Sequence, residues 1–260
     1  MKDHVDSTQE LVRLREENAR LIALLEAHGI KWGPPQPAVV VARVPEPSRL
    51  TTAEKVTLFR QLFRGRTDVY PVRWDGKTSG KSGYAPACAN EWRAGVCEKP
   101  RIKCGDCSNR LLIALSDAVI YDHLAGAHTV GVYPLLEDDT CYFLAADFDG
   151  ADWRDDARAF IQSCEDLGVP AALEISRSGN GAHAWVFFAS RVSARDARRL
   201  GTAIISHTCS RTRQLKLESY DRLFPNQDTM PKGGFGNLIA LPLQKLPRER
   251  GCSVFVDAKL

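Results

Sequence analysis

The sequence lacks any apolar run that approaches the roughly 18 residues needed to span a membrane. Its first residues, MKDHVDSTQE, also lack the basic and apolar regions of a secretory signal peptide. Both absences argue against a membrane-spanning or secreted protein, and we expect a cytoplasmic one. The formal net charge of only +3 does not by itself indicate nucleic-acid binding, although local basic patches would permit it.

The composition is that of an ordinary folded protein. A hydrophobic fraction of 44% with 26% charged residues excludes disorder for most of the chain. The length of 260 residues suffices for one sizeable core with appendages.

Eight cysteines in a cytoplasmic protein are interpreted as thiols, metal ligands or catalysts before disulfides. Four of them form the pattern C-x8-C-x6-C-x2-C in one polar segment, which favours a structural four-thiolate Zn²⁺ site over free or redox-active cysteines: Cys88, Cys97, Cys104 and Cys107. The basic residues around them suggest contact with nucleic-acid phosphates: Arg93, Lys99, Arg101, Lys103 and Arg110. The other four cysteines lie in apolar surroundings typical of core thiols.

Three regions follow from the composition along the chain. Residues 1–31 contain a heptad-like seam of less than three heptads, which predicts either weak self-association or a lone amphipathic helix: Leu11, Leu14, Asn18, Leu21, Leu25 and His28. Residues 32–47 are rich in proline and predict a linker. Residues 48–260 form the compact domain, in which Thr51 and Glu54 predict a capping box at a helix start.

A regular pattern begins at Cys141. Strands are predicted at 141–149, 171–176, 182–189, 237–243 and 252–257, and helices at 153–167 and 193–205. This β-α-β-β-α-β order predicts an α+β fold of the split, RNA-recognition-motif-like type.

Two aspartates close the first of these strands. Asp147 and Asp149 are separated by one residue, so they project from the same face of the strand. Because two adjacent anions repel, a divalent cation such as Mg²⁺ or Mn²⁺ would explain them. The alternative is a helix cap beside a solvated strand end.

Two further motifs bear on this choice. Ser178, Gly179 and Gly181 form a tight turn before His183, a pattern that suits a bound phosphate or, alternatively, a simple hairpin. Asp257 closes the apolar strand VFVD, and it would complete a two-metal site unless it is an ordinary turn residue.

A D-x-D strand end, the motif GAH and the motif VFVD, in that order, resemble the archaeo-eukaryotic primase superfamily. The stretch LFPNQDTMPKGGFGNLIALPLQ and the cysteine segment look similar to the primase-polymerases of TOTE conflict systems and to CRISPR-associated primase-polymerases. The resemblance extends from about Leu58 to Leu260. Within it, residues 84–110 correspond to a zinc knuckle and residues 130–260 to the catalytic core.

The resemblance implies a nucleotidyltransferase that starts and extends a strand on a single-stranded DNA template with primer, using NTPs or dNTPs. Asp147, Asp149 and Asp257 would hold two Mg²⁺ or Mn²⁺ ions, and His183, helped by Ser178 and the turn at Gly181, would contact the triphosphate. Lys232 is a candidate second phosphate anchor or a plain surface lysine, and Arg177 is a similar candidate.

The resemblance also suggests a helicase or nuclease as a partner. Relatives continue beyond the position of Asp257, so we expect a chain truncated at its C-terminus. Two other functions stay open: a non-catalytic nucleic-acid-binding module and a metal-dependent nuclease. Carboxylates on the sheet argue against the former, because a binding sheet favours aromatic and basic residues.

Overall fold

The computed structural model describes residues 3–28, 48–76, 80–211 and 219–257, which fall into two units, Met1–Arg49 and Leu50–Leu260. In the described part of the first unit the chain forms the helix α1 (Asp3–Ala27). Leu14 and Leu21 of the predicted seam are exposed on it, so pairing through this helix stays a prediction. The predicted linker at 32–47 lies outside the described residues. No described helix has the length and hydrophobicity to cross a membrane.

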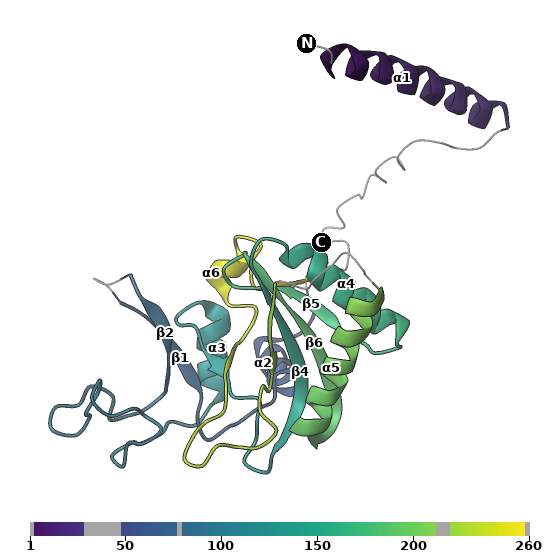
Figure 1. The fold of residues 1–260 in the computed structure, drawn as a ribbon. Helices are drawn as coiled ribbons and strands as arrows, with labels where there is room; N and C mark the ends of the chain where they lie inside the picture. Colours follow the sequence, from purple (N-terminus) through teal and green to yellow (C-terminus); the bar gives the residue numbers. More distant parts are fainter. Residues whose placement is uncertain (1–2, 29–47, 77–79, 212–218, 258–260) are drawn as a thin grey trace. The chain divides into compact units, whose positions relative to one another are not determined.

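The second unit is built on a five-stranded antiparallel sheet with the strand order β7-β4-β6-β5-β9 (Figure 1). These strands are β4 (Thr140–Asp149), β5 (Ala172–Ile175), β6 (Gly181–Ser193), β7 (Tyr220–Phe224) and β9 (Val254–Val256). Two short pairs lie beside it: β1 (Pro71–Asp75) with β2 (Ser82–Pro86), and β3 (Gly131–Val132) with β8 (Ile239–Ala240). The helices are α2 (Thr52–Leu62), α3 (Asp117–Ala125), α4 (Trp153–Asp166), α5 (Ala194–Arg211) and α6 (Lys245–Arg248). The predicted α+β class is confirmed.

The elements β4-α4-β5-β6-α5-β7 follow the β-α-β-β-α-β order. Its last strand is β7, a segment for which the sequence analysis predicted no strand. The predicted strands at 237–243 and 252–257 correspond to β8 and β9. Of these, β8 pairs with β3 outside the main sheet, and β9 forms the edge of that sheet next to β5.

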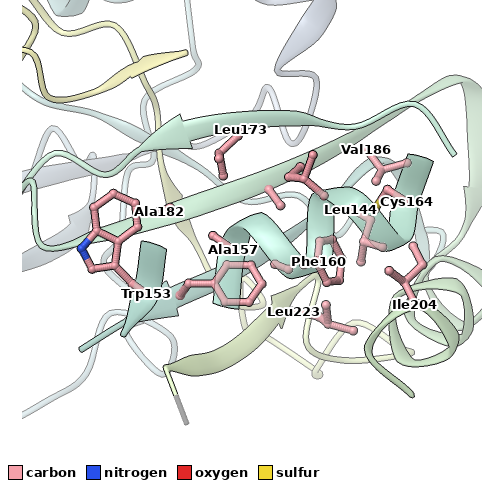
Figure 2. Packing of buried hydrophobic residues seen from close by; sticks show 14 residues of the cluster. Leu144, Trp153, Ala157, Phe160, Cys164, Leu173, Ala182, Val186, Ile204 and Leu223 are labelled. Atoms are coloured by element: carbon pink, nitrogen blue, oxygen red, sulfur yellow. The ribbon is translucent and has the colours of Figure 1, made fainter. Parts of the chain in front are cut away.

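Alternate residues of β4 pack against different layers. Leu144, Ala146 and Phe148 face α4 and α5, where Phe148 meets Phe160 of α4 at a ring distance of 5.5 Å. Figure 2 shows this layer of the core, with Leu144 near Cys164 of α4 and Ile204 of α5. Phe143 and Ala145 belong to the core on the other face, which includes residues of α2 and α3. Because the alternation continues, Asp147 and Asp149 project on the α2 side of the sheet. The hydrophobic pattern of β4 therefore fixes the face on which the carboxylates lie.

Hydrogen bonds at helix starts agree with the sequence. The Thr51 N–H donates to the Glu54 carboxylate at 2.7 Å and the Glu54 N–H donates to the Thr51 hydroxyl at 3.3 Å, so the predicted capping box is confirmed. At the start of α5, the Ser193 hydroxyl accepts from the Asp196 N–H at 3.1 Å. This cap ends β6 and turns the chain into α5.

Candidate functional site

Three carboxylates converge where β4 ends. Asp147 and Asp149 come from β4 and Asp221 comes from β7, and one oxygen of each lies within 4.8 Å of the other two. The Asp147 side chain is only 13% exposed, whereas Asp149 and Asp221 are open to solvent. It is the one cluster of this kind that the described part of the chain contains. Three carboxylate oxygens at this spacing form a donor set suited to Mg²⁺ or Mn²⁺.

Asp221 reaches the cluster because β7 carries a β-bulge. Arg222 pairs with Asp147 and Tyr220 pairs with the next residue of β4, Phe148, so Asp221 is the extra residue between them. Tyr220 packs against Phe148 on the α4 side of the sheet. A bulge redirects side chains in this way, and here it brings a third carboxylate to the face of the first two.

The start of β7 is anchored by buried hydrogen bonds. The Ser219 carbonyl accepts from the Asp149 N–H at 2.7 Å. The Ser219 N–H and hydroxyl both donate to the Asp156 carboxylate of α4, at 3.1 and 2.6 Å. Arg222 donates to the Asp221 carboxylate at 2.6 Å. These contacts hold the edge strand against β4 while Asp221 faces solvent.

His183 lies directly opposite Asp147 in the β4–β6 pairing and forms part of a buried chain of polar groups. Its Nε2 is 3.4 Å from the Asp147 carboxylate, and its Nδ1 is 2.8 Å from the Glu174 carboxylate. Glu174, only 2% exposed, also accepts from the Trp185 indole N–H at 3.0 Å. With Nδ1 held by Glu174, the imidazole presents Nε2 to the carboxylate cluster.

The charges around this chain alter two pKa values. Burial opposes the charged imidazole, but Glu174, Asp147 and Asp149 outweigh it and raise the pKa of His183. Burial raises the pKa of Asp147 to about 6; His183 opposes this rise, and Asp149 and Asp221 add to it. The metal-free protein therefore disfavours the ionised form of Asp147, and a bound divalent cation would stabilise that form.

Replacing Asp147 with asparagine should therefore stabilise the metal-free protein. An unfolded aspartate has a pKa near 4, so the folded protein holds this proton more tightly and loses stability as the pH rises from about 4 to about 6. Above pH 6 the penalty is about 3 kcal/mol of unfolding free energy. In EDTA at pH 7.5, Asp147→Asn should gain up to that amount in urea unfolding, and the gain should shrink at pH 4.5.

Mn²⁺ should stabilise the parent far more than it stabilises Asp147→Asn. Asp155→Asn is the matched control, because Asp155 is an exposed carboxylate of α4 paired with Arg158. An Asp147→Asn protein that is less stable than the parent in EDTA at pH 7.5 would contradict this expectation.

The glycine turn between β5 and β6 stands beside the carboxylates. A Cβ on Gly181 would lie 2.3 Å from the Asp149 carboxylate oxygen, so only glycine lets β6 approach β4 here. The Ser178 side chain is exposed, and its hydroxyl accepts from the Asn180 N–H at 3.2 Å. Arg177 lies beside Tyr84 of β2: burial raises the pKa of Tyr84, and Arg177 partly offsets the rise.

Two predicted site residues lie elsewhere. Asp257 follows β9, which is separated from β4 by β5 and β6, so the two strands lie about 14 Å apart across the sheet, and Asp257 is two residues past Phe255, the residue in register with Asp147. Lys232 belongs to the loop after β7, where the Met230 N–H donates to Asp139 at 2.6 Å. Asp139 precedes β4, eight residues or roughly 25 Å before Asp147 along an extended strand. The structure therefore brings Asp221, and neither Asp257 nor Lys232, to Asp147 and Asp149.

The four clustered cysteines border one small cavity: Cys88, Cys97, Cys104 and Cys107. Among the described residues, no three of their sulfurs lie within 4.8 Å of one another. The Cys88 sulfur accepts from the Leu111 N–H at 3.3 Å. Arg110 donates to the carbonyls of Cys104 and Gly233, at 3.2 and 3.0 Å, so this segment contacts the loop that carries Lys232.

The sequence analysis missed two residues of the site. Glu174 could have been found, because a single acid inside the apolar strand AALEIS needs a buried partner. Asp221 could not have been found in this way. Leu223 faces α4, and strict alternation would place Asp221, two residues earlier, on the α4 side of the sheet as well.

One protein family matches most of the chain. Residues 54–260 match the family described as the archaeo-eukaryotic primase domain of the TOTE conflict system. No curated protein sequence matches the chain. Among solved structures, the polymerase domain of Mycobacterium tuberculosis ligase D in complex with DNA is similar at 15% identity and a TM-score of 0.39. This similarity covers 63% of the chain and 61% of that domain, which is less than two thirds of its length.

Proposed function

The chain belongs to the archaeo-eukaryotic primase family of TOTE conflict systems, and we propose that it is a template-directed primase-polymerase. It would transfer nucleotides from NTPs or dNTPs to a 3′-hydroxyl on a single-stranded DNA template, with or without a primer. The observation that carries the proposal is the convergence of Asp147, Asp149 and Asp221 beside His183. Nucleotidyl transfer depends on charge neutralisation and alignment, and this donor set is suited to both.

Asp147, Asp149 and Asp221 would hold one or two Mg²⁺ or Mn²⁺ ions, which, when bound, neutralise the triphosphate and activate the attacking 3′-hydroxyl. Asp221 takes the role that the sequence motif suggested for Asp257. Arg222 lies against Asp221 and restrains its carboxylate at the mouth of the site. Burial first, and then the neighbouring Asp149 and Asp221, raise the pKa of Asp147, so a bound cation would stabilise its ionised form.

His183 would bind and orient the incoming nucleotide. Its Nε2 faces the carboxylates, where the phosphate oxygens would gather, and Glu174 supports a charged, correctly oriented ring. Gly181 leaves room beside Asp149, and the exposed hydroxyl of Ser178, held by hydrogen bonds with Ser176 and Asn180, lies at the adjacent turn. The 3′-hydroxyl loses its proton to solvent as its oxygen bonds to the α-phosphorus, the bond from that phosphorus to the bridging oxygen of the β-phosphate breaks, and pyrophosphate leaves.

Incubation with a single-stranded DNA template, labelled nucleotides and Mn²⁺ or Mg²⁺ tests this function. We expect extension of an annealed primer and new strands when the primer is omitted. In a parallel reaction with an end-labelled template, shortening of that template would indicate a nuclease instead. Template binding without incorporation under any of these conditions would leave a binding module and overturn the proposal.

We also propose one structural Zn²⁺ bound by Cys88, Cys97, Cys104 and Cys107. Their shared cavity and the N–H donated to the Cys88 sulfur support a thiolate cluster. Because all four ligands would be protein side chains, the ion would stabilise this segment and leave chemistry to the aspartates.

Metal analysis of the purified protein should find about one zinc per chain. The double variant Cys104→Ser, Cys107→Ser should lose it and become sensitive to proteolysis between about residues 84 and 109. Cys209→Ser, which changes an exposed cysteine of α5, should keep the zinc. Parent protein without stoichiometric zinc would rule the site out.

A further inference from the structure

A cavity of about 660 Å³ lies in the second unit at the other end of β4. It is bordered by the C-terminal half of α2, the start of α3 and the chain that leads into β4. Its residue Tyr142 is five positions before Asp147, or about 16 Å along the strand. Cavities of this volume commonly hold small ligands or parts of larger ones.

The charged lining of the cavity is mostly neutralised. Of the four arginines that line it, three are paired with carboxylates: Arg60 with Asp117 at 2.5 Å, Arg66 with Glu137 at 3.1 Å, and Arg191 with Asp138 at 2.8 Å. Arg66 also pairs with Asp68 at 2.5 Å. These pairs form a rim with little net charge, so they add little to the binding of an anion.

Arg64 is the exception. Among the described residues no carboxylate pairs with it, and its guanidinium lies 4.0 Å from the centre of the Tyr142 ring. One terminal nitrogen donates to the Phe188 carbonyl at 3.2 Å, while its Nε is buried without a hydrogen-bond partner. The other terminal nitrogen, Nη1, makes no hydrogen bond to any described residue and is not buried, so an anionic acceptor in the cavity could bond to it.

We propose that this cavity binds the phosphate and base of one nucleotide, separately from the carboxylate cluster. The Arg64 guanidinium stacks on Tyr142, and its Nη1, which does not bond to Phe188, can donate to a phosphate oxygen. The half-buried side chains of Leu115, Leu136 and Tyr142 supply apolar and aromatic surface for the base. With a single unneutralised arginine, the cavity matches one phosphate and not a triphosphate.

The nucleotide can come from two sources that share this chemistry: a free mononucleotide or one unit of a DNA strand. Calorimetric titrations in EDTA distinguish the two sources. Because EDTA removes the divalent ions that the proposed polymerase reaction needs, the result does not depend on that reaction. The probes are dAMP, deoxyadenosine, inorganic phosphate and a six-nucleotide oligodeoxyadenylate. We expect deoxyadenosine and phosphate to bind at least about tenfold more weakly than dAMP, because each retains only half of the contacts.

A strand that binds more tightly than dAMP would identify the DNA strand as the source, and the reverse order would identify the free nucleotide. Arg64→Gln should weaken binding of the preferred probe by about tenfold or more. Tyr142→Leu, which keeps the charge and removes the stacking surface, should weaken it by a smaller factor. Arg199→Gln on the outer face of α5 is the matched control and should bind like the parent.

Melting curves of each variant establish that it is folded before titration. If Arg64→Gln melts early, Tyr142→Leu alone decides. Absence of binding by every probe, or equal binding by the parent and the folded Arg64 and Tyr142 variants, would overturn the proposal.

Discussion

Replacing Asp221 with asparagine should reduce nucleotide addition by at least about a hundredfold, whereas Asp257→Asn should leave it within about twofold of the parent. The carboxylate of Asp221 lies within 4.8 Å of those of Asp147 and Asp149, and Asp257 follows a strand separated from β4 by two others. Asparagine keeps the size of the side chain but removes the charge that a divalent cation requires. Primer extension at saturating Mn²⁺ and dNTP measures both variants.

The same two variants distinguish a catalytic loss from a folding defect. Asp221 is exposed and its neighbour Arg222 remains in place, so Asp221→Asn should melt close to the parent in EDTA. Mn²⁺ should raise the melting temperature of Asp257→Asn and not that of Asp221→Asn. Parent-like extension by Asp221→Asn together with inactive Asp257→Asn would restore the role that the sequence motif suggested for Asp257.

Glu174→Ala should lower the free energy of unfolding by about 3 kcal/mol and also weaken nucleotide binding. The change removes the acceptor shared by the His183 ring and the Trp185 indole at a position only 2% exposed. Without it, both donors stay buried and unpaired, and the ring loses the partner that orients Nε2. Urea unfolding and the KM for the incoming nucleotide report the two effects separately.

Glu174→Gln keeps one acceptor oxygen and should recover part of the stability while the KM stays raised. Trp185→Phe is the matched control: it removes the second donor and leaves the contact between Glu174 and His183 intact. Its KM should therefore remain near that of the parent. A parent-like KM in both Glu174 variants would mean that Glu174 only stabilises the core.

Much of this architecture could be predicted because it follows from periodicity. Alternation in β4 placed Asp147 and Asp149 on one face, and the glycine turn predicted that β6 would begin near His183, which the pairing places opposite Asp147. The position of the third carboxylate, that of Asp221, does not follow from any periodicity in the sequence. VFVD is an apolar run closed by an aspartate, so it predicted a strand and a strand-end aspartate correctly, but pairing placed that strand next to β5.

The segment YDRLF has polar residues at its centre and was not predicted as a strand. Its position beside β4 depends on the buried contact between Ser219 and Asp156, which joins residues 63 positions apart in the sequence. The role of Asp221 then depends on a bulge, which is defined only once two strands pair. Sequence spacing alone could not give either result.

The position of Asp221 on an edge strand links ion binding to the local opening of the fold. β7 is five residues long and, within the main sheet, pairs only with β4, so it should detach at a lower free energy than the central strands. Each detachment would carry one of three carboxylates away, and each bound cation would oppose it. Amide hydrogen exchange in β7 should therefore slow on addition of Mn²⁺, while exchange in β5 and β6 changes little. The fraction of the protein in which β7 is paired with β4 would then determine how much of it can bind the ion.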